Sequence, residues 1–168
     1  IGMNAMNSFT MKCLTELGYD YIMPSPELTG VQLASIAEHS ALADRMLIGI
    51  HGRTPLMQLL HCPIKEHKGC QNCMGIAGAV TDEAGRVFPL VNIRYPDNCL
   101  VRMLNCRTTD LIDLFDRIPQ TAGYVLNFVG EQIDEVTERI AAANEAMNGK
   151  RQTQYPNSTR GHWVRKVE

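Results

Sequence analysis

The cysteines of this chain are gathered in one stretch, and this clustering constrains the fold more than any other feature. Five of the 6 cysteines lie between Cys62 and Cys106. The densest part runs from His61 to Cys73 and holds Cys62 and a Cys-x-x-Cys pair that begins at Cys70. Cysteines used only as small core residues would be scattered along the chain. Thiols gathered around one loop indicate a metal or iron–sulfur site.

The composition predicts an ordinary globular domain. The chain has 168 residues, of which 45% are apolar and 20% charged, and its net charge of -2 gives no overall basic field for nucleic acid. No apolar run approaches the roughly 20 residues that span a bilayer, and no signal peptide is visible. We therefore expect a cytoplasmic protein without a membrane span. In that reducing compartment a Cys-x-x-Cys cluster is more often a metal or redox site than a disulfide framework.

Apolar periodicity predicts a series of alternating strands and helices. The expected strands span residues 2–6, 19–23, 45–51, 100–104 and 124–129. The expected helices span residues 8–17, 29–38, 108–115 and 131–147, the last with Ile133, Val136, Ile140 and Ala143 on its apolar face. Repeated βα units with short connections imply a parallel sheet with helices outside. An open doubly wound sheet and part of an eight-stranded βα barrel both fit this pattern.

An insertion interrupts the series and defines the expected organisation. Residues 52–98 hold the cysteine loop, a possible short helix near 55–60, and a β-hairpin over 79–91. We expect residues 1–149 to form a partial TIM-type βα barrel with about five parallel strands and helices outside. Residues 150–168 form a basic C-terminal tail. The chain opens with Ile1 in what looks like a buried strand, which suggests a piece of a longer polypeptide or a processed chain.

Four thiolates of the cluster could hold one metal centre. Three of the candidate ligands are Cys62, Cys70 and Cys73. Cys99, which opens the strand after the hairpin, is favoured as the fourth, and Cys106 is its competitor. The residue types fit a [4Fe–4S] cluster or a structural zinc ion and do not separate the two. The sixth cysteine, Cys13, lies on a helix face and is expected in the core.

Polar residues follow several of the expected strands. Since the carboxyl ends of parallel strands carry the active site in βα folds, these residues would converge on one pocket. His51 suits proton transfer, Arg53 suits an anion, and Glu27 is held by the proline before it. The expected substrate contacts are Asn4, Asn7 and Asn105. The alternative for each residue is a loop position that makes a local hydrogen bond.

The C-terminal tail combines basic residues with the only tryptophan of the chain, Trp163. Such a segment could contact nucleic acid by stacking and phosphate pairing. It could equally dock its tryptophan on the domain.

Several short motifs resemble the collagenase-like peptidase family, in the family's order and over nearly the whole chain. They are Asn4–Ser8, Pro24–Leu28, Ile50–Met57, the Cys62/Cys70/Cys73 loop, Phe88–Leu90, Leu104-Asn105 and Thr159–His162. The resemblance implies a βα barrel with a cysteine-bound [4Fe–4S] cluster, of which this chain is similar to the later part. It further implies that the missing N-terminal half of the barrel, or a partner subunit, completes the fold.

The resemblance assigns three cluster ligands, Cys62, Cys70 and Cys73. For the fourth ligand, some members resemble this chain in having a cysteine like Cys99. Many others place it a few residues after the segment that matches Asn105-Cys106, where this chain has no cysteine.

The family resemblance implies two kinds of activity. Better-understood members carry out oxygen-independent hydroxylation of an RNA base or a ubiquinone precursor, with prephenate proposed as the oxygen donor. The family name implies a peptidase acting on collagen-like or other proteins, although no Ser–His–Asp, Cys–His or His-Glu-x-x-His pattern is legible here. A non-catalytic module stapled by a metal is the third possibility. RNA and a small carboxylate are the partners expected under the first reading.

Overall fold

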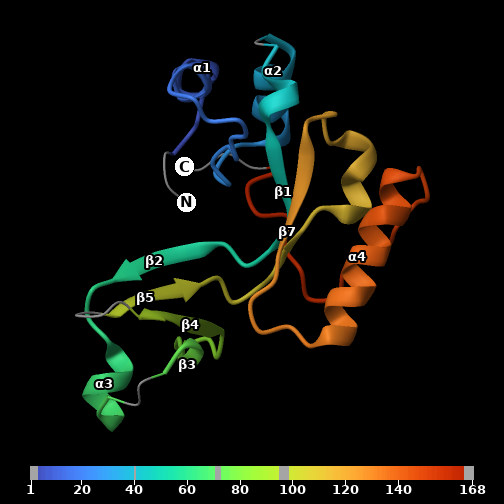
Figure 1. The fold of residues 1–168 in the computed structure, drawn as a ribbon. Helices are drawn as coiled ribbons and strands as arrows, with labels where there is room; N and C mark the ends of the chain where they lie inside the picture. Colours follow the sequence, from blue (N-terminus) through green and yellow to red (C-terminus); the bar gives the residue numbers. More distant parts are fainter. Residues whose placement is uncertain (1–3, 40, 71–72, 95–98, 165–168) are drawn as a thin grey trace.

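The computed structural model describes residues 4–39, 41–70, 73–94 and 99–164. It is a mixed α/β fold with two small sheets (Figure 1). The α-helices are α1 (Ser8–Glu16), α2 (Gly30–His39), α3 (Pro63–Lys68) and α4 (Ile133–Met147). The strands are β1 (Leu47–Gly52), β2 (Pro55–Leu59), β3 (Gly75–Thr81), β4 (Val87–Arg94), β5 (Cys99–Leu104), β6 (Thr109–Asp110) and β7 (Gly123–Asn127). Two 3-10 helices, η1 and η2, span Ala43–Arg45 and Ile112–Arg117.

The two sheets differ in how their strands pair. The three-stranded sheet has the order β6-β1-β7, with β7 parallel and β6 antiparallel to β1. The four-stranded sheet has the order β2-β5-β4-β3 and is antiparallel throughout. In Figure 1 this second sheet extends away from β1 and β7 as an arm, with α3 below it on the side of β3.

The expected partial barrel of five parallel strands is therefore wrong. Strand 100–104 joins the hairpin and β2 instead of lying beside β1. Residues 4–7 form no strand, and the expected strand at 19–23 is reduced to a single bridge between Ile22 and Met46. The first residues of the expected strand at 2–6 lie outside the described part of the chain. A short apolar run predicts a strand but carries no information on whether its neighbours are parallel or antiparallel.

Two further local expectations are also wrong. Residues 55–59 are a strand rather than a helix, because they pair with β5 along its length. The expected helix at 108–115 is replaced by β6 and η2, because Asp110 pairs with His51 and the amide of Leu111 donates to the carbonyl of Ile50. Both changes come from long-range backbone hydrogen bonds, which outweigh weak local helix propensity.

The starts of helices are predicted better than the pairing of strands, because the signals for a helix start lie in neighbouring residues. The capping box of α2 is present, with the amide of Thr29 donating to the Gln32 side chain and the amide of Gln32 to the Thr29 hydroxyl. Helix α1 begins at Ser8, the first residue of the expected helix, but its N-cap is Asn7, whereas the sequence suggests Ser8 as the cap. Helix α4 begins with a second capping box, between Gln132 and Glu135.

Helix α4 packs with a face that only partly coincides with the expected one. Its buried residues are Arg139, Ala142, Ala143 and Ala146. Of the expected face, Ala143 is buried and Val136 half-buried, whereas Ile133 and Ile140 are 75% and 45% exposed. The small alanines allow the helix to lie close to η2.

The C-terminal segment docks on the domain, in agreement with the second of the two readings of the tail. Trp163 is 9% exposed and packs against Gly30, whose amide donates to the Trp163 carbonyl. Arg160 pairs with Asp113 through both guanidinium nitrogens. No helix in the described ranges is long and apolar enough to cross a membrane.

Candidate functional site

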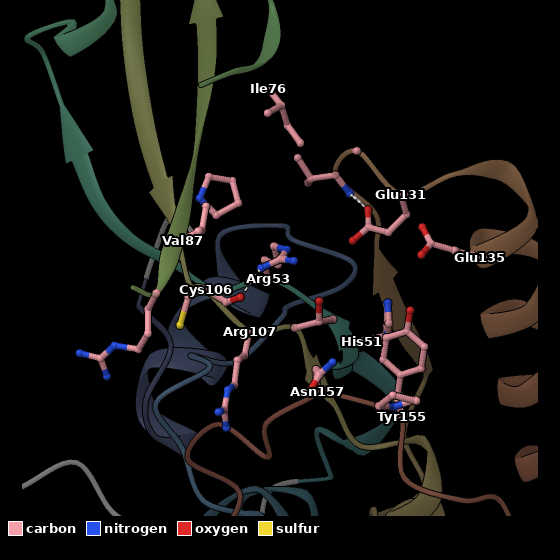
Figure 2. Close-up of a pocket in the computed structure, with 16 residues that line it drawn as sticks. His51, Arg53, Ile76, Val87, Cys106, Arg107, Glu131, Glu135, Tyr155 and Asn157 are labelled. Carbon is pink, nitrogen blue, oxygen red and sulfur yellow. Dashed lines mark hydrogen bonds between the residues drawn. The ribbon is translucent and has the colours of Figure 1, made fainter. Parts of the chain in front are cut away.

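A cavity of about 500 Å³ lies where the arm meets the three-stranded sheet. Its walls come from the end of β1, the start of β4, the segment after β5, the β7–α4 loop and residues 155–157 (Figure 2). The charged or titratable lining residues are His51, Arg53, Arg86, Cys106, Arg107, Glu131, Glu135 and Tyr155. The cavity is thus polar and open to ligands from solvent, with one buried imidazole in its wall.

His51 is held by Asp110 from the neighbouring strand. The two residues are directly opposed in the β1–β6 pair, so their side chains share one face of the sheet. His51 Nδ1 lies 2.7 Å from Asp110 Oδ2, and the residues are 4% and 0% exposed. A carboxylate only accepts hydrogen bonds, so Nδ1 carries the hydrogen and Nε2 of the neutral ring is the acceptor. This is the arrangement that prepares a histidine to accept a proton from a ligand.

Asp110 is itself fixed by further contacts. Its Oδ1 accepts from the amide of Ile112 at 3.3 Å, and its carbonyl accepts from Arg160 at 3.0 Å. Arg139 Nη1 lies 4.0 Å from its Oδ2. A buried carboxylate needs such donors, because without them its desolvation would be costly. The pair is therefore a rigid unit that holds one tautomer and one ring orientation of His51.

Tyr155 covers the other side of His51. The two rings meet edge to face with centroids 5.7 Å apart, and the guanidinium of Arg139 lies 4.5 Å from the Tyr155 ring centre. Burial raises the pKa of the Tyr155 phenol above its ordinary value of 10.0, and the Glu135 carboxylate adds to this rise. The phenol therefore stays protonated and can donate a hydrogen bond across the neutral pH range.

Arg53 connects the pocket to the end of β5. Its Nη1 donates to the carbonyls of Asn105 and Cys106 at 2.9 and 2.8 Å. These contacts fix the guanidinium plane and leave its other nitrogens available for a ligand. Arg107 is exposed at the same wall (Figure 2). Two guanidinium groups in the same cavity wall as a histidine held in one orientation suit an anionic ligand that exchanges a proton.

The structure brings together only part of the expected site. His51 and Arg53 line the cavity, whereas Asn105 is not among its lining residues and only accepts a hydrogen bond from Arg53 with its backbone carbonyl. Asn4, Asn7 and Glu27 do not line it. These three belong to segments that were expected to be strands of one sheet and that form no such strands here. Their side chains are consequently not carried to the mouth where His51 lies.

Asn7 and Glu27 instead have local roles. Asn7 Oδ1 accepts from the amide of Thr10 at 2.8 Å and caps α1. Glu27 is exposed, and its amide donates to the Ser25 hydroxyl at 3.4 Å. Asn7 thus makes a local hydrogen bond with its side chain, and Glu27 makes one with its backbone amide.

The cysteines are related by the strand order of the arm. Cys99 opens β5 and is paired with Arg94 at the end of β4. At this same end of the sheet, β2 ends shortly before Cys62 and β3 begins just after Cys73. Cys70 lies in the connection between α3 and β3. Cys106 follows the opposite end of β5 and lines the cavity instead.

The residues near this outer end include the cysteines that the sequence proposes as metal ligands. Thiolates are the ligands of iron–sulfur clusters and of structural zinc. Within the described residues, no three cysteine, histidine or acidic side chains lie close enough together to hold a metal ion. One observation points to the sulfurs: the buried amide of Asn92 donates to Cys73 Sγ at 3.2 Å. Cys13 is exposed on α1, so its expected place in the core is wrong.

Sequence reasoning missed the residues that complete the pocket. Asp110 falls in the expected helix over 108–115, Arg139 in the expected helix over 131–147, and Tyr155 in the C-terminal tail, and none of them is singled out. Asp110 lies 59 positions from His51, so no local spacing connects them. For Asp110 the sequence shows only an aspartate beside a short apolar run, a pattern that is typical of many loops.

Comparison of the chain with protein-family models, with curated proteins and with solved structures gives no match. The function is therefore inferred from the pocket, the cysteine end of the arm and the motifs of the sequence.

Proposed function

We propose that this chain is an iron–sulfur protein similar to the collagenase-like peptidase family, whose cluster is held by Cys62, Cys70, Cys73 and Cys99. The observation that carries the proposal is the strand order β2-β5-β4-β3. This order brings three chain segments to one end of the arm, and each of these segments contains or adjoins a cysteine. Four thiolates at one such end suit a [4Fe–4S] cluster, with zinc as the alternative.

The cavity is the proposed substrate site. Arg53 and Arg107 bind an anionic group such as a carboxylate, because guanidinium forks match carboxylate oxygens. His51 accepts a proton at Nε2, and Asp110 stabilises the imidazolium that forms. Tyr155 donates a hydrogen bond or excludes water beside the ring. The cluster, when bound, supplies one-electron chemistry or binds substrate.

The substrate class follows from the family resemblance. We propose oxygen-independent hydroxylation of an RNA base or a quinone precursor, with a small carboxylate such as prephenate as oxygen donor. Arg53 and Arg107, two of the three arginines that line the cavity, support a carboxylate ligand. The net charge of -2 does not favour broad RNA binding, so an RNA substrate would bind through local contacts.

The test is anaerobic purification followed by iron, acid-labile sulfide and zinc analysis with a visible absorption spectrum. A brown protein with iron and sulfide in stoichiometric amounts supports the proposal. A colourless protein with stoichiometric zinc overturns the iron–sulfur assignment and leaves a metal-stapled module. The matched control is Cys13→Ser, which removes an exposed thiol on α1, far along the chain from the arm.

A peptidase is the second candidate, and one observation favours it. The cavity wall contains both a thiol, Cys106, and a histidine, His51, that is oriented by a buried aspartate. A nucleophile, a base and an orienting carboxylate are the parts of an acyl-transfer site. The test is peptide hydrolysis that survives removal of contaminating proteases. Its loss in both Cys106→Ser and His51→Ala, with full activity in Cys13→Ser, would favour this candidate.

We also propose that a partner covers the outer face of α4. Ile133, Ile140 and Met147 are 75%, 45% and 56% exposed on this helix. The neighbouring β7 is an edge strand of its sheet. A second copy of this chain would bury both features. Sedimentation equilibrium over a range of protein concentrations tests this, and a monomer at every concentration would contradict it.

A further inference from the structure

The cavity between the arm and the three-stranded sheet is lined by charges of both signs. Besides Arg53 and Arg107, its wall contains the carboxylates of Glu131 and Glu135. Figure 2 shows the two glutamates next to each other, with Arg53 and Arg107 apart from them. None of these four side chains forms an ion pair within the described part of the chain. Opposite charges thus line one cavity without neutralising one another.

Backbone groups hold three of these side chains in place. Arg53 Nη1 donates to two carbonyls after β5. Glu131 Oε2 accepts from the amide of Val129, and Glu135 Oε2 accepts from the amide of Gln132 at 2.9 Å. Arg53 and Glu131 are also half-buried. The anchored groups are therefore positioned before a ligand binds, which lowers the entropic cost of binding.

The hydrogen bonds of the fold use only one oxygen of each glutamate. Oε1 of Glu131 and of Glu135 accepts no hydrogen bond from a described residue, and a glutamine could serve the same amides with its carbonyl oxygen. The N-terminal end of α4 does favour negative charge, but Asp134 supplies it in the same turn without lining the cavity. The charges of the two glutamates are thus available to a ligand.

The rest of the wall is largely apolar. It includes Ile76, Val87, Pro89 and Val129. A cavity of about 500 Å³ that combines apolar side chains with a few polar groups is typical of sites for small molecules. Its ligand should therefore have an apolar part besides its charged groups.

We infer that the cavity binds a small zwitterion, an amino acid with an apolar side chain, whose ammonium group lies against Glu131 and Glu135. Its carboxylate binds Arg53 and Arg107. The inference rests on the carboxylate site of the proposed function and narrows its ligand, and it does not depend on the metal centre. A purely anionic ligand would pair with the arginines and leave the Glu131 carboxylate unpaired.

The test is isothermal titration calorimetry of the full chain with matched ligands. Phenylalanine carries both charges, 3-phenylpropionate lacks the ammonium group, and phenethylamine lacks the carboxylate. The variant Glu131→Gln removes the charge and keeps an oxygen for the amide of Val129. The matched control is Asp134→Asn, which makes the same charge change in the first turn of α4, outside the cavity wall. Circular dichroism reports whether each variant is folded.

We expect phenylalanine to bind the wild-type protein at least about tenfold more tightly than either of the other two ligands, because each of them loses one set of charge-assisted hydrogen bonds. Glu131→Gln should weaken the binding of phenylalanine by about tenfold and leave that of 3-phenylpropionate unchanged. Asp134→Asn should bind all ligands as the wild-type protein does. If Glu131→Gln does not fold, Glu135→Gln is judged by the same comparison.

Two outcomes separate this inference from the proposed function. Equal binding of phenylalanine and 3-phenylpropionate overturns the inference and leaves the carboxylate site in place. Absence of binding by both overturns the carboxylate site and the inference together. Phenethylamine that binds as tightly as phenylalanine also overturns the inference, because the arginines then make no contribution.

Discussion

His51 and Asp110 face each other across an antiparallel strand pair, and His51 Nδ1 lies 2.7 Å from Asp110 Oδ2 in the buried interior. The pair joins the central strand β1 to the segment that follows β5. It also gives the wall of the cavity a histidine with a single orientation. The stability of the fold and the proposed role of His51 thus depend on the same hydrogen bond.

Removal of the Asp110 carboxylate should weaken the fold strongly. Asp110→Ala leaves His51 Nδ1 and Arg139 without a buried acceptor, so we expect a loss of about 3–5 kcal/mol in the free energy of unfolding. Urea unfolding measures this loss. The control is Asp116→Ala, an exposed aspartate for which about 0.5 kcal/mol or less is expected. Equal losses in the two variants would contradict the role given to the pair.

The two cysteines that compete for the fourth cluster bond should behave differently. Cys99 opens β5 and Cys106 follows its far end, so a strand of roughly 20 Å separates them. We expect Cys99→Ser to lose most of its iron and sulfide during anaerobic purification. Cys106→Ser should retain both. The reverse result would place the fourth ligand at the cavity and remove the arm's outer end as the metal site.

A methyl group at Gly30 should dislodge the only tryptophan. A Cβ at Gly30 would lie 2.6 Å from the indole of Trp163, which has to move. We expect Gly30→Ala to lower the free energy of unfolding by about 1–3 kcal/mol. Its tryptophan fluorescence should shift to the red, because the indole becomes exposed.

Gly49→Ala is the matched control for this change. The nearest atom to a Cβ there is the sulfur of Met23, at 4.0 Å. We expect wild-type fluorescence from this variant. A wild-type spectrum from Gly30→Ala as well would show that the C-terminal segment is not docked as described.

Tyr155 should make stability depend on pH in the alkaline range. Its pKa is raised in the folded protein, mainly by burial, so the folded state holds the phenolic proton more tightly than the unfolded state does. The resulting stability is fully present below the ordinary pKa of 10.0 and is lost as pH rises through the folded value. Tyr155→Phe should flatten this decline in urea unfolding between about pH 8 and pH 11.

Tyr21→Phe serves as the control for the alkaline experiment, since Tyr21 is 60% exposed. Its pH profile should follow that of the wild-type protein. A wild-type profile for Tyr155→Phe would contradict the burial of the phenol in the folded state.

Features with local signals could be predicted from the sequence. The capping box at Thr29 and Gln32 begins α2 as expected, because its hydrogen bonds join residues three positions apart. The apolar run before His51 is a buried strand, and helix α4 ends at Met147 as expected. In these cases the residues that form the structure are neighbours in the chain, so their pattern contains the information.

Features that depend on distant partners could not be predicted in the same way. The run at 100–104 reads equally well as a barrel strand or as a hairpin-sheet strand, and its pairing with β2 and β4 decides between them. The apolar face of α4 was expected to be buried, but Ile133 remains exposed because the alanines pack instead. Asp110 became part of the pocket only through its pairing with His51.

The sequence by itself determined which chemistry is available: a set of clustered thiols, a histidine and an arginine after a buried strand, and a short loop that bends at Gly69. The tertiary structure decided how these groups are divided between two places. Strand pairing put Cys99 at the outer end of the arm and Cys106 in the wall of the cavity, which His51 also lines. The physical reason is that hydrogen bonds between strands join residues far apart in the chain, and local patterns carry no record of those partners.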